Sequence, residues 1–164
     1  MLNRRHLRIK VLQALFAWFR SGNDDLHGGR KELMHSIDKV YDMYLFMLRT
    51  LEELHRFAEQ RIESNKKKKL PTEDDINPNT TFIDNKALLA LRNDSGVARE
   101  YEKRKIAWLD FEETFRKIFN EIRASELYSA YITSNPELKE DKDFVIEMFK
   151  EFVINNEMLF DFFE

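Results

Sequence analysis

Residues 30–64 read RKELMHSIDKVYDMYLFMLRTLEELHRFAEQRIES, a stretch of the chain without glycine or proline. Apolar side chains recur along this stretch at spacings that alternate between four and three residues. The recurring positions are Leu33, Ile37, Val40, Tyr44, Met47, Leu51, Leu54 and Ala58. This spacing places the side chains along one face of an α-helix, in the pattern of a helix that packs lengthwise on others. The stretch therefore predicts one long central helix of a bundle.

Shorter helical patterns lie on both sides of this stretch, each bounded by turn-forming residues. They predict further helices over about 3–20, 84–92, 97–107, 110–133 and from 140 onward. Asn3 is the expected N-cap of the first helix, and Asp110 with Glu113 is expected to form a capping box. Residues 65–83 hold a lysine run, an acidic run and two prolines, so we expect a flexible loop there.

No strand pattern occurs in the sequence, so the predicted fold class is all-α. We expect a single all-helical domain over 1–164, a helical bundle with one long central helix and about five to six helices in total. Six of the fourteen phenylalanines lie between Phe144 and Phe163, and the last residues are MLFDFFE. Domain ends are usually polar and poorly ordered. Two expectations stay open: this end buries itself, or the chain is the amino-terminal portion of a longer protein.

The composition excludes several classes of function. Among its 164 residues there is no cysteine, which excludes thiol catalysis, iron–sulfur clusters and zinc sites with cysteine ligands. The longest apolar run, 43–48, is about six residues, whereas a membrane-spanning helix needs about 20. Phosphate-binding glycine loops and the common hydrolase motifs are absent from the sequence. We therefore predict a protein that is not an enzyme, with no catalytic residue, no cofactor and no metal site.

The charges are divided unevenly along the chain. The whole sequence holds 27 basic and 30 acidic residues, a net charge of −3. Residues 1–20 hold five basic residues and no acidic one, so the other 144 residues carry a net charge of −8. A basic end on an acidic body identifies the first helix as the candidate binding surface.

Three arginines, Arg4, Arg5 and Arg8, lie in the first two turns of that predicted helix. The positive end of a helix dipole lies at its N-terminus, so these charges are unfavourable there unless an anion binds. Exposed N–H groups and guanidinium groups together favour phosphate. Two alternatives remain: a solvated helix end that makes salt bridges to the acidic body, and an arginine-rich targeting peptide.

Three other patterns have simpler explanations. The lysines of 66–69 lie beside acidic residues, so a solvated loop is favoured over a nucleic-acid patch. Glu32-x-x-His35 and Glu52-x-x-His55 match halves of a di-iron motif, but both lie on one predicted helix, about 30 Å apart. A calcium-loop pattern that starts at Asp75 lacks the required glycine and the final glutamate.

Residues 4–18, RRHLRIKVLQALFAW, resemble the opening helix of the NusB family of bacterial transcription antitermination factors. That family starts with an arginine-rich segment that runs into a Val-x-Gln-Ala-Leu-Tyr-like core. Gln13, Ala14 and Leu15 match the Gln-Ala-Leu of this core, and Phe16 matches its aromatic residue. The second-half motifs of the family are absent, so the chain resembles the amino-terminal part of a long-form relative.

The resemblance implies an all-helical, cytoplasmic protein that binds the boxA element of nascent ribosomal RNA, a single-stranded target. It also implies a small-subunit ribosomal protein and the transcription elongation complex as partners. Arg4, Arg5 and Arg8 fall on the family's basic RNA-binding positions, and His6 falls where an arginine can stand. The alternative function is a helical protein–protein adaptor with no RNA binding, in which the long helix or the phenylalanine-rich end contacts the partner.

Overall fold

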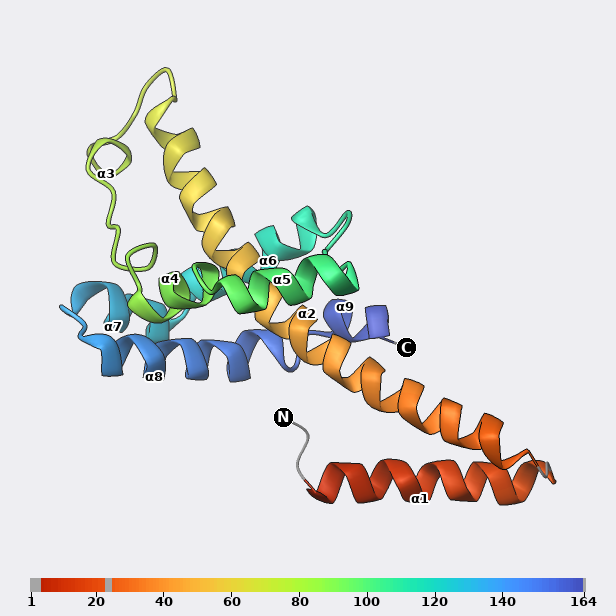
Figure 1. Ribbon diagram of the computed structural model, residues 1–164. Coiled ribbons are helices and arrows are strands. Elements are labelled where there is room, and N and C mark those ends of the chain that lie inside the picture. The colour runs from red at the N-terminus through yellow and green to blue at the C-terminus, as the bar shows by residue number, and fades with distance from the viewer. Residues whose placement is uncertain (1–3, 23–24, 164) are drawn as a thin grey trace. The chain divides into compact units, whose positions relative to one another are not determined.

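The computed structural model describes residues 4–22 and 25–163, and these residues form helices joined by turns and loops, with no β-strand (Figure 1). Nine α-helices are present in the described ranges. They are α1 (Arg4–Ser21), α2 (Leu26–Lys66), α3 (Glu73–Ile76), α4 (Lys86–Arg92), α5 (Ser95–Arg104), α6 (Glu112–Ala124), α7 (Glu126–Thr133), α8 (Leu138–Met148) and α9 (Glu157–Phe160). A π-helical segment follows α8 at Phe149–Val153, and a 3₁₀ turn follows α9 at Asp161–Phe163. The predicted all-α class is confirmed.

The predicted number of five to six helices is too low. The expected helix over 110–133 is divided at Ser125, whose extended backbone ends α6 and whose hydroxyl accepts a hydrogen bond from Tyr128 N at 3.1 Å to begin α7. The expected last helix is likewise divided into α8, the π-helical segment and α9. A short helix, α3, also forms within the predicted loop, capped by Thr72. Side-chain caps at Ser125 and Asn156 thus begin α7 and α9 within stretches where the apolar pattern predicts continuous helices.

Two capping predictions have different outcomes. The expected N-cap Asn3 lies outside the described residues. The expected capping box of Asp110 and Glu113 is wrong: Asp110 has a left-handed backbone, φ 63°, and Phe111 stands at the cap of α6 without a side-chain hydrogen bond. A residue with positive φ cannot adopt the extended conformation that a capping box requires.

The chain divides into two compact units, and α2 contributes to both. Unit 1 comprises residues 1–45 and unit 2 comprises residues 46–164. The long helix begins at Leu26, four residues before the predicted start, and ends at Lys66. The prediction of a central bundle helix therefore holds for only part of α2. Residues 26–45 belong to unit 1, and residues 46–66 belong to unit 2, which holds the main core.

The core of unit 2 is built mainly from aromatic and branched aliphatic side chains of α2, α4, α6 and α8 and of the segments beside them. Its fully buried members include Leu54, Phe82, Leu88, Ile118, Ile122, Met148, Val153 and Leu159. Phe82 lies among three other rings, with centroid distances of 5.5 Å to Phe119, 5.9 Å to Tyr128 and 6.0 Å to Phe144. Aromatic pairs at such distances stabilise a core beyond the area that they bury.

A buried polar network joins α4, α7 and α8 within this core. The hydroxyl of Tyr131 donates to Asp141 Oδ1 at 2.6 Å and accepts from Asn85 Nδ2 at 2.8 Å. The other carboxylate oxygen of Asp141 accepts from the backbone N–H of Lys86 at 2.9 Å. Burial is the main reason that the pKa of Tyr131 is raised, and the hydrogen bond to Asp141 raises it further. These bonds satisfy polar groups that would otherwise be costly to bury.

The phenylalanine-rich end packs against the start of the α2 portion of unit 2. The ring of Phe162 lies 5.0 Å from that of Phe46 and 4.7 Å from that of Trp108, and Phe163 lies beside both. Leu159 is completely buried, whereas Phe160 and Phe162 keep part of their surface exposed. Within the described residues, no helix combines the length and apolar character that a membrane span requires.

Candidate nucleic-acid interface

Helix α1 forms a hairpin with the first part of α2 inside unit 1 (Figure 1). The chain leaves α1 at Gly22, which has a left-handed backbone, φ 62°, a conformation that glycine adopts without steric cost. Trp18 then packs on Gly29, where an added Cβ would lie 3.2 Å from the indole Cδ1. A shallow pocket of about 210 Å³ lies between the two helices, lined by Ala14 on α1 and by Leu33 on α2 among others. Helix α1, which carries the predicted site at its N-terminal end, is therefore held against α2 by contacts near its C-terminal end.

All four predicted RNA-binding residues are exposed at the beginning of α1. Arg4, Arg5, His6 and Arg8 lie in its first two turns, and no acidic residue occurs in the first turn. Among the described residues of unit 1, no carboxylate lies within ion-pair distance of any of the three arginines. Arg4, Arg5 and Arg8 therefore have no ion-pair partner among the described residues of that unit.

The electrostatics of α1 differ between its two ends. Arg20 lies in the last turn, where a positive charge is favourable because the negative end of the helix dipole lies there. Arg4 and Arg5 lie at the opposite end, where the unpaired backbone N–H groups and the dipole already favour a negative charge. The first two turns therefore combine guanidinium donors with a helix end that attracts anions.

The apolar face of α1 is covered only in part. No residue of α1 is fully buried. Leu7, Ala14 and Trp18 are half-buried, but Leu12, Phe16 and Phe19 are 69%, 63% and 73% exposed. The apolar pattern of α1 does not show which of its side chains a neighbouring helix covers and which stay exposed.

The two halves of the di-iron motif lie in different units, Glu32 and His35 in unit 1 and Glu52 and His55 in unit 2. The ring of His55 is buried, and its Nε2 lies 2.8 Å from the carbonyl oxygen of Ile83. Glu52 accepts hydrogen bonds from Tyr101 and Arg49, both at 3.0 Å. No group of three histidine, aspartate or glutamate side chains in the described ranges is arranged to hold a metal ion. His55 and Glu52, the half of the motif in unit 2, form hydrogen bonds between α2 and neighbouring segments of that unit.

The lysine run is partly neutralised by acidic neighbours. Lys68 pairs with Asp75 at 3.0 Å, and Lys66 lies 3.7 Å from Glu63. The carboxylate of Asp75 also accepts the backbone N–H of Thr72 at 3.1 Å. That backbone hydrogen bond, followed by the one from Lys68, holds the pKa of Asp75 below its usual range. Asp75 is therefore a structural partner of the run and also takes part in the capping box of α3.

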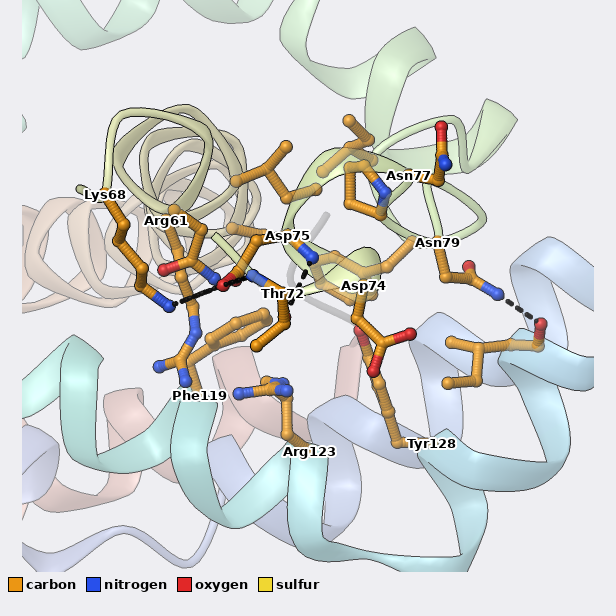
Figure 2. A pocket seen from close by; sticks show the side chains of 17 residues that line it. Arg61, Lys68, Thr72, Asp74, Asp75, Asn77, Asn79, Phe119, Arg123 and Tyr128 are labelled. Carbon is orange, nitrogen blue, oxygen red and sulfur yellow. Dashed lines mark hydrogen bonds and ion pairs between the residues drawn. The ribbon is translucent and has the colours of Figure 1, made fainter. Parts of the chain in front are cut away.

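Sequence reasoning missed a second polar site, which lies in unit 2. A pocket of about 750 Å³ is bordered by the end of α2, the segment around α3, and helices α6 and α7 (Figure 2). Its lining includes Arg61 and Arg123, which are 62 positions apart in the sequence. No motif links residues at such a separation, so only the fold reveals that they share a pocket.

Burial and like charge both act on the groups in this pocket. The pKa of Arg61 is lowered, first by burial and then by the positive charge of Arg123. The pKa of Tyr128 is raised by burial, although both arginines act in the opposite direction. An arginine remains charged under ordinary conditions, so two guanidinium groups repel each other here.

Comparisons with protein-family models, with curated proteins and with solved structures find no match to this chain.

Proposed function

We propose that this protein is a NusB-like transcription antitermination factor, without enzymatic activity, that binds single-stranded boxA-type RNA in the cytoplasm. Arg4, Arg5 and Arg8 supply the principal contacts, and His6 lies beside them. The observation that carries the proposal is the exposure of these three arginines at one helix end, with no carboxylate partner in the described part of unit 1. The resemblance of residues 4–18 to the family's opening helix supports it independently.

The chemistry of this surface fits RNA better than a small ligand. Guanidinium groups donate to phosphate oxygens in a planar fork and also stack on unpaired bases. The contacts to phosphates fix the position of the strand, whereas contacts to exposed bases select its sequence. The α1 surface presents hydrogen-bond donors for phosphate contacts along two helical turns. Selection of a boxA-type sequence is proposed to be shared with a small-subunit ribosomal protein within the elongation complex.

Mutation of the arginines tests this proposal directly. Arg4→Ala, Arg5→Ala and Arg8→Ala together are expected to weaken binding of a short boxA-type RNA by about tenfold or more, because charge-assisted contacts are lost. Arg30→Ala, Lys31→Ala and Lys39→Ala form the control, since they remove the same charge from exposed positions of α2 in the same unit. An electrophoretic shift titration measures both. Equal weakening in the two triple variants would show that only the total charge matters.

A protein–protein adaptor is the second candidate, and one observation favours it. Leu12, Phe16 and Phe19 form an exposed apolar stripe on α1, and exposed apolar surface of this kind marks interaction sites. An amphipathic helix of a partner would cover such a stripe through its own apolar face. Absence of RNA binding by the unaltered protein at low salt would favour this adaptor function over the RNA-binding one.

A further inference from the structure

The polar pocket of unit 2 brings three cationic side chains together. Figure 2 shows the ends of Arg61, Lys68 and Arg123 on the same side of the pocket, pointing toward one another. Arg61 extends from the last turns of α2, and Arg123 extends from the end of α6. Two carboxylates, Asp74 and Asp75, also line the pocket, so its charged side chains carry a net charge of +1.

Ion pairing inside the pocket leaves the two arginines uncompensated. Lys68 and Asp75 neutralise each other through contacts of 3.0 and 3.1 Å. Arg61 donates through Nη1 to the amide oxygen of Asn120 at 3.0 Å, which fixes the position of its guanidinium without neutralising it. Across the described ranges, neither Arg61 nor Arg123 lies within ion-pair distance of Asp74.

Two neighbouring guanidinium groups without an acidic partner repel each other, although Arg123 is exposed and Arg61 is only half-buried, so that solvent screens part of the repulsion. Each guanidinium carries five N–H donors, and Arg61 uses one of them for Asn120, so donors remain for a ligand. The hydroxyl of Tyr128 lies in the same pocket and can donate as well. An oxyanion would relieve the repulsion and accept several charge-assisted hydrogen bonds together.

We propose that this pocket binds a phosphate group through Arg61 and Arg123, with Tyr128 as an additional donor. The site lies in unit 2, whereas the proposed RNA contacts lie on α1, so the two proposals do not depend on each other. A pocket of about 750 Å³ lies in the size range of small-molecule sites, which is larger than one phosphate ion requires. The phosphate group therefore belongs to a small phosphorylated molecule or to an RNA backbone.

Isothermal titration of the full chain with inorganic phosphate, at constant ionic strength set with chloride, tests the site. Arg61→Gln and Arg123→Gln are each expected to weaken phosphate binding by about tenfold or more, because each removes charge-assisted donors. Arg116→Gln is the matched control, since Arg116 is also on α6 but pairs with Glu112 and Glu113 outside the pocket. It is expected to bind phosphate as the unaltered protein does.

Asp74→Asn gives a test with the opposite sign. Removing this negative charge from the pocket lining is expected to tighten phosphate binding by several-fold. Arg123→Gln also relieves the repulsion on Arg61, so it is expected to keep its fold in the absence of phosphate, as circular dichroism and thermal unfolding would show. Lack of phosphate binding by the unaltered protein, or binding that is equal in Arg123→Gln and Arg116→Gln, would overturn the proposal.

Two further titrations distinguish the sources of the phosphate group. Adenosine monophosphate represents a small phosphorylated molecule, and a single-stranded RNA oligonucleotide represents a nucleic-acid backbone. If Arg123→Gln weakens binding of the mononucleotide alone, the pocket is assigned to small ligands. If the substitution weakens binding of both the mononucleotide and the RNA, the pocket is assigned to RNA phosphates as well. If the pocket variants change the affinity for neither ligand, the proposed site is contradicted. Binding of RNA through α1 is measured separately with the α1 variants.

Discussion

Units 1 and 2 show how differently one helical pattern can be used within a single chain. In unit 2, Leu51, Leu54 and Ala58 of α2 are buried in the core. In unit 1, Leu33 and Ile37 of the same helix are only half-buried and Tyr44 is 49% exposed, although the spacing is unbroken. The difference teaches that apolar periodicity determines which face of a helix is available for burial. Whether that face is covered depends on the elements that the rest of the chain supplies.

The two units also differ in how their polar groups are used. Unit 2 contains a buried hydrogen-bonded network around Tyr131 and Asp141. In unit 1, the arginines at the start of α1 face solvent instead. The network of unit 2 therefore fixes the packing of its helices, whereas the three arginines of unit 1 are exposed to a ligand. This contrast predicts that stability is determined mainly in unit 2 and that RNA binding is determined in unit 1.

Replacing one phenylalanine of each unit by alanine tests this contrast, and it should give the largest change in the free energy of unfolding. Phe82→Ala should lower the free energy of unfolding by about 3–5 kcal/mol, because it leaves a cavity among three packed rings. Phe16→Ala is the matched change in unit 1. It should alter the free energy of unfolding by less than about 0.5 kcal/mol, because the ring of Phe16 is mostly exposed. Urea denaturation measures both variants. Similar losses would show that Phe16 is packed as tightly as Phe82.

Removal of one hydroxyl group from each unit should give an intermediate effect. Tyr131→Phe should destabilise the protein by about 1–3 kcal/mol, because Asp141 and Asn85 lose a buried partner. Tyr44→Phe removes the same group from an exposed ring of unit 1 and should change stability by less than about 0.5 kcal/mol. A Tyr131→Phe variant as stable as the Tyr44→Phe variant would mean that the network contributes no net stability.

Acid titration should give the smallest of the stability effects. The backbone N–H of Thr72, and then Lys68, hold the pKa of Asp75 below its usual value of 3.8. The folded state therefore favours the carboxylate form, so this stabilisation is complete above the unfolded pKa and is lost as the pH falls through the lower folded value. Asp75→Asn should flatten the decrease in unfolding free energy below about pH 4. An unchanged acid profile would contradict the role assigned to this carboxylate.

The fold class and the first helix could be predicted from the sequence because both depend on local periodicity. The region without glycine or proline at 30–64 predicts a helix, and the described helix α2 extends it at both ends. The break at Ser125 could not be predicted in this way, because the apolar pattern runs through it and a single capping hydroxyl decides the outcome. The left-handed backbone at Asp110 is likewise not visible in the Asp-x-x-Glu spacing, which predicts a capping box there.

The candidate sites were predictable to different extents for the same physical reason. Arg4, Arg5 and Arg8 are neighbours in the sequence, so helical geometry alone places them together at one helix end. Arg61 and Arg123 come together only when α2 packs near α6, and a contact between positions so far apart leaves no local signal. The exposure of Phe16 and Phe19 could not be predicted from the sequence, because residue type indicates apolar character and not the presence of a neighbour.

The salt dependence of RNA binding tests the central claim most directly. Each phosphate contact to a single strand contributes about 0.7 to the slope of log affinity against log salt concentration. Replacement of Arg4, Arg5 and Arg8 by alanine should therefore reduce that slope by about 2 units, while the control triple variant of α2 should keep the slope of the unaltered protein. An unchanged slope and affinity in the arginine variant would contradict the assignment of RNA binding to the start of α1.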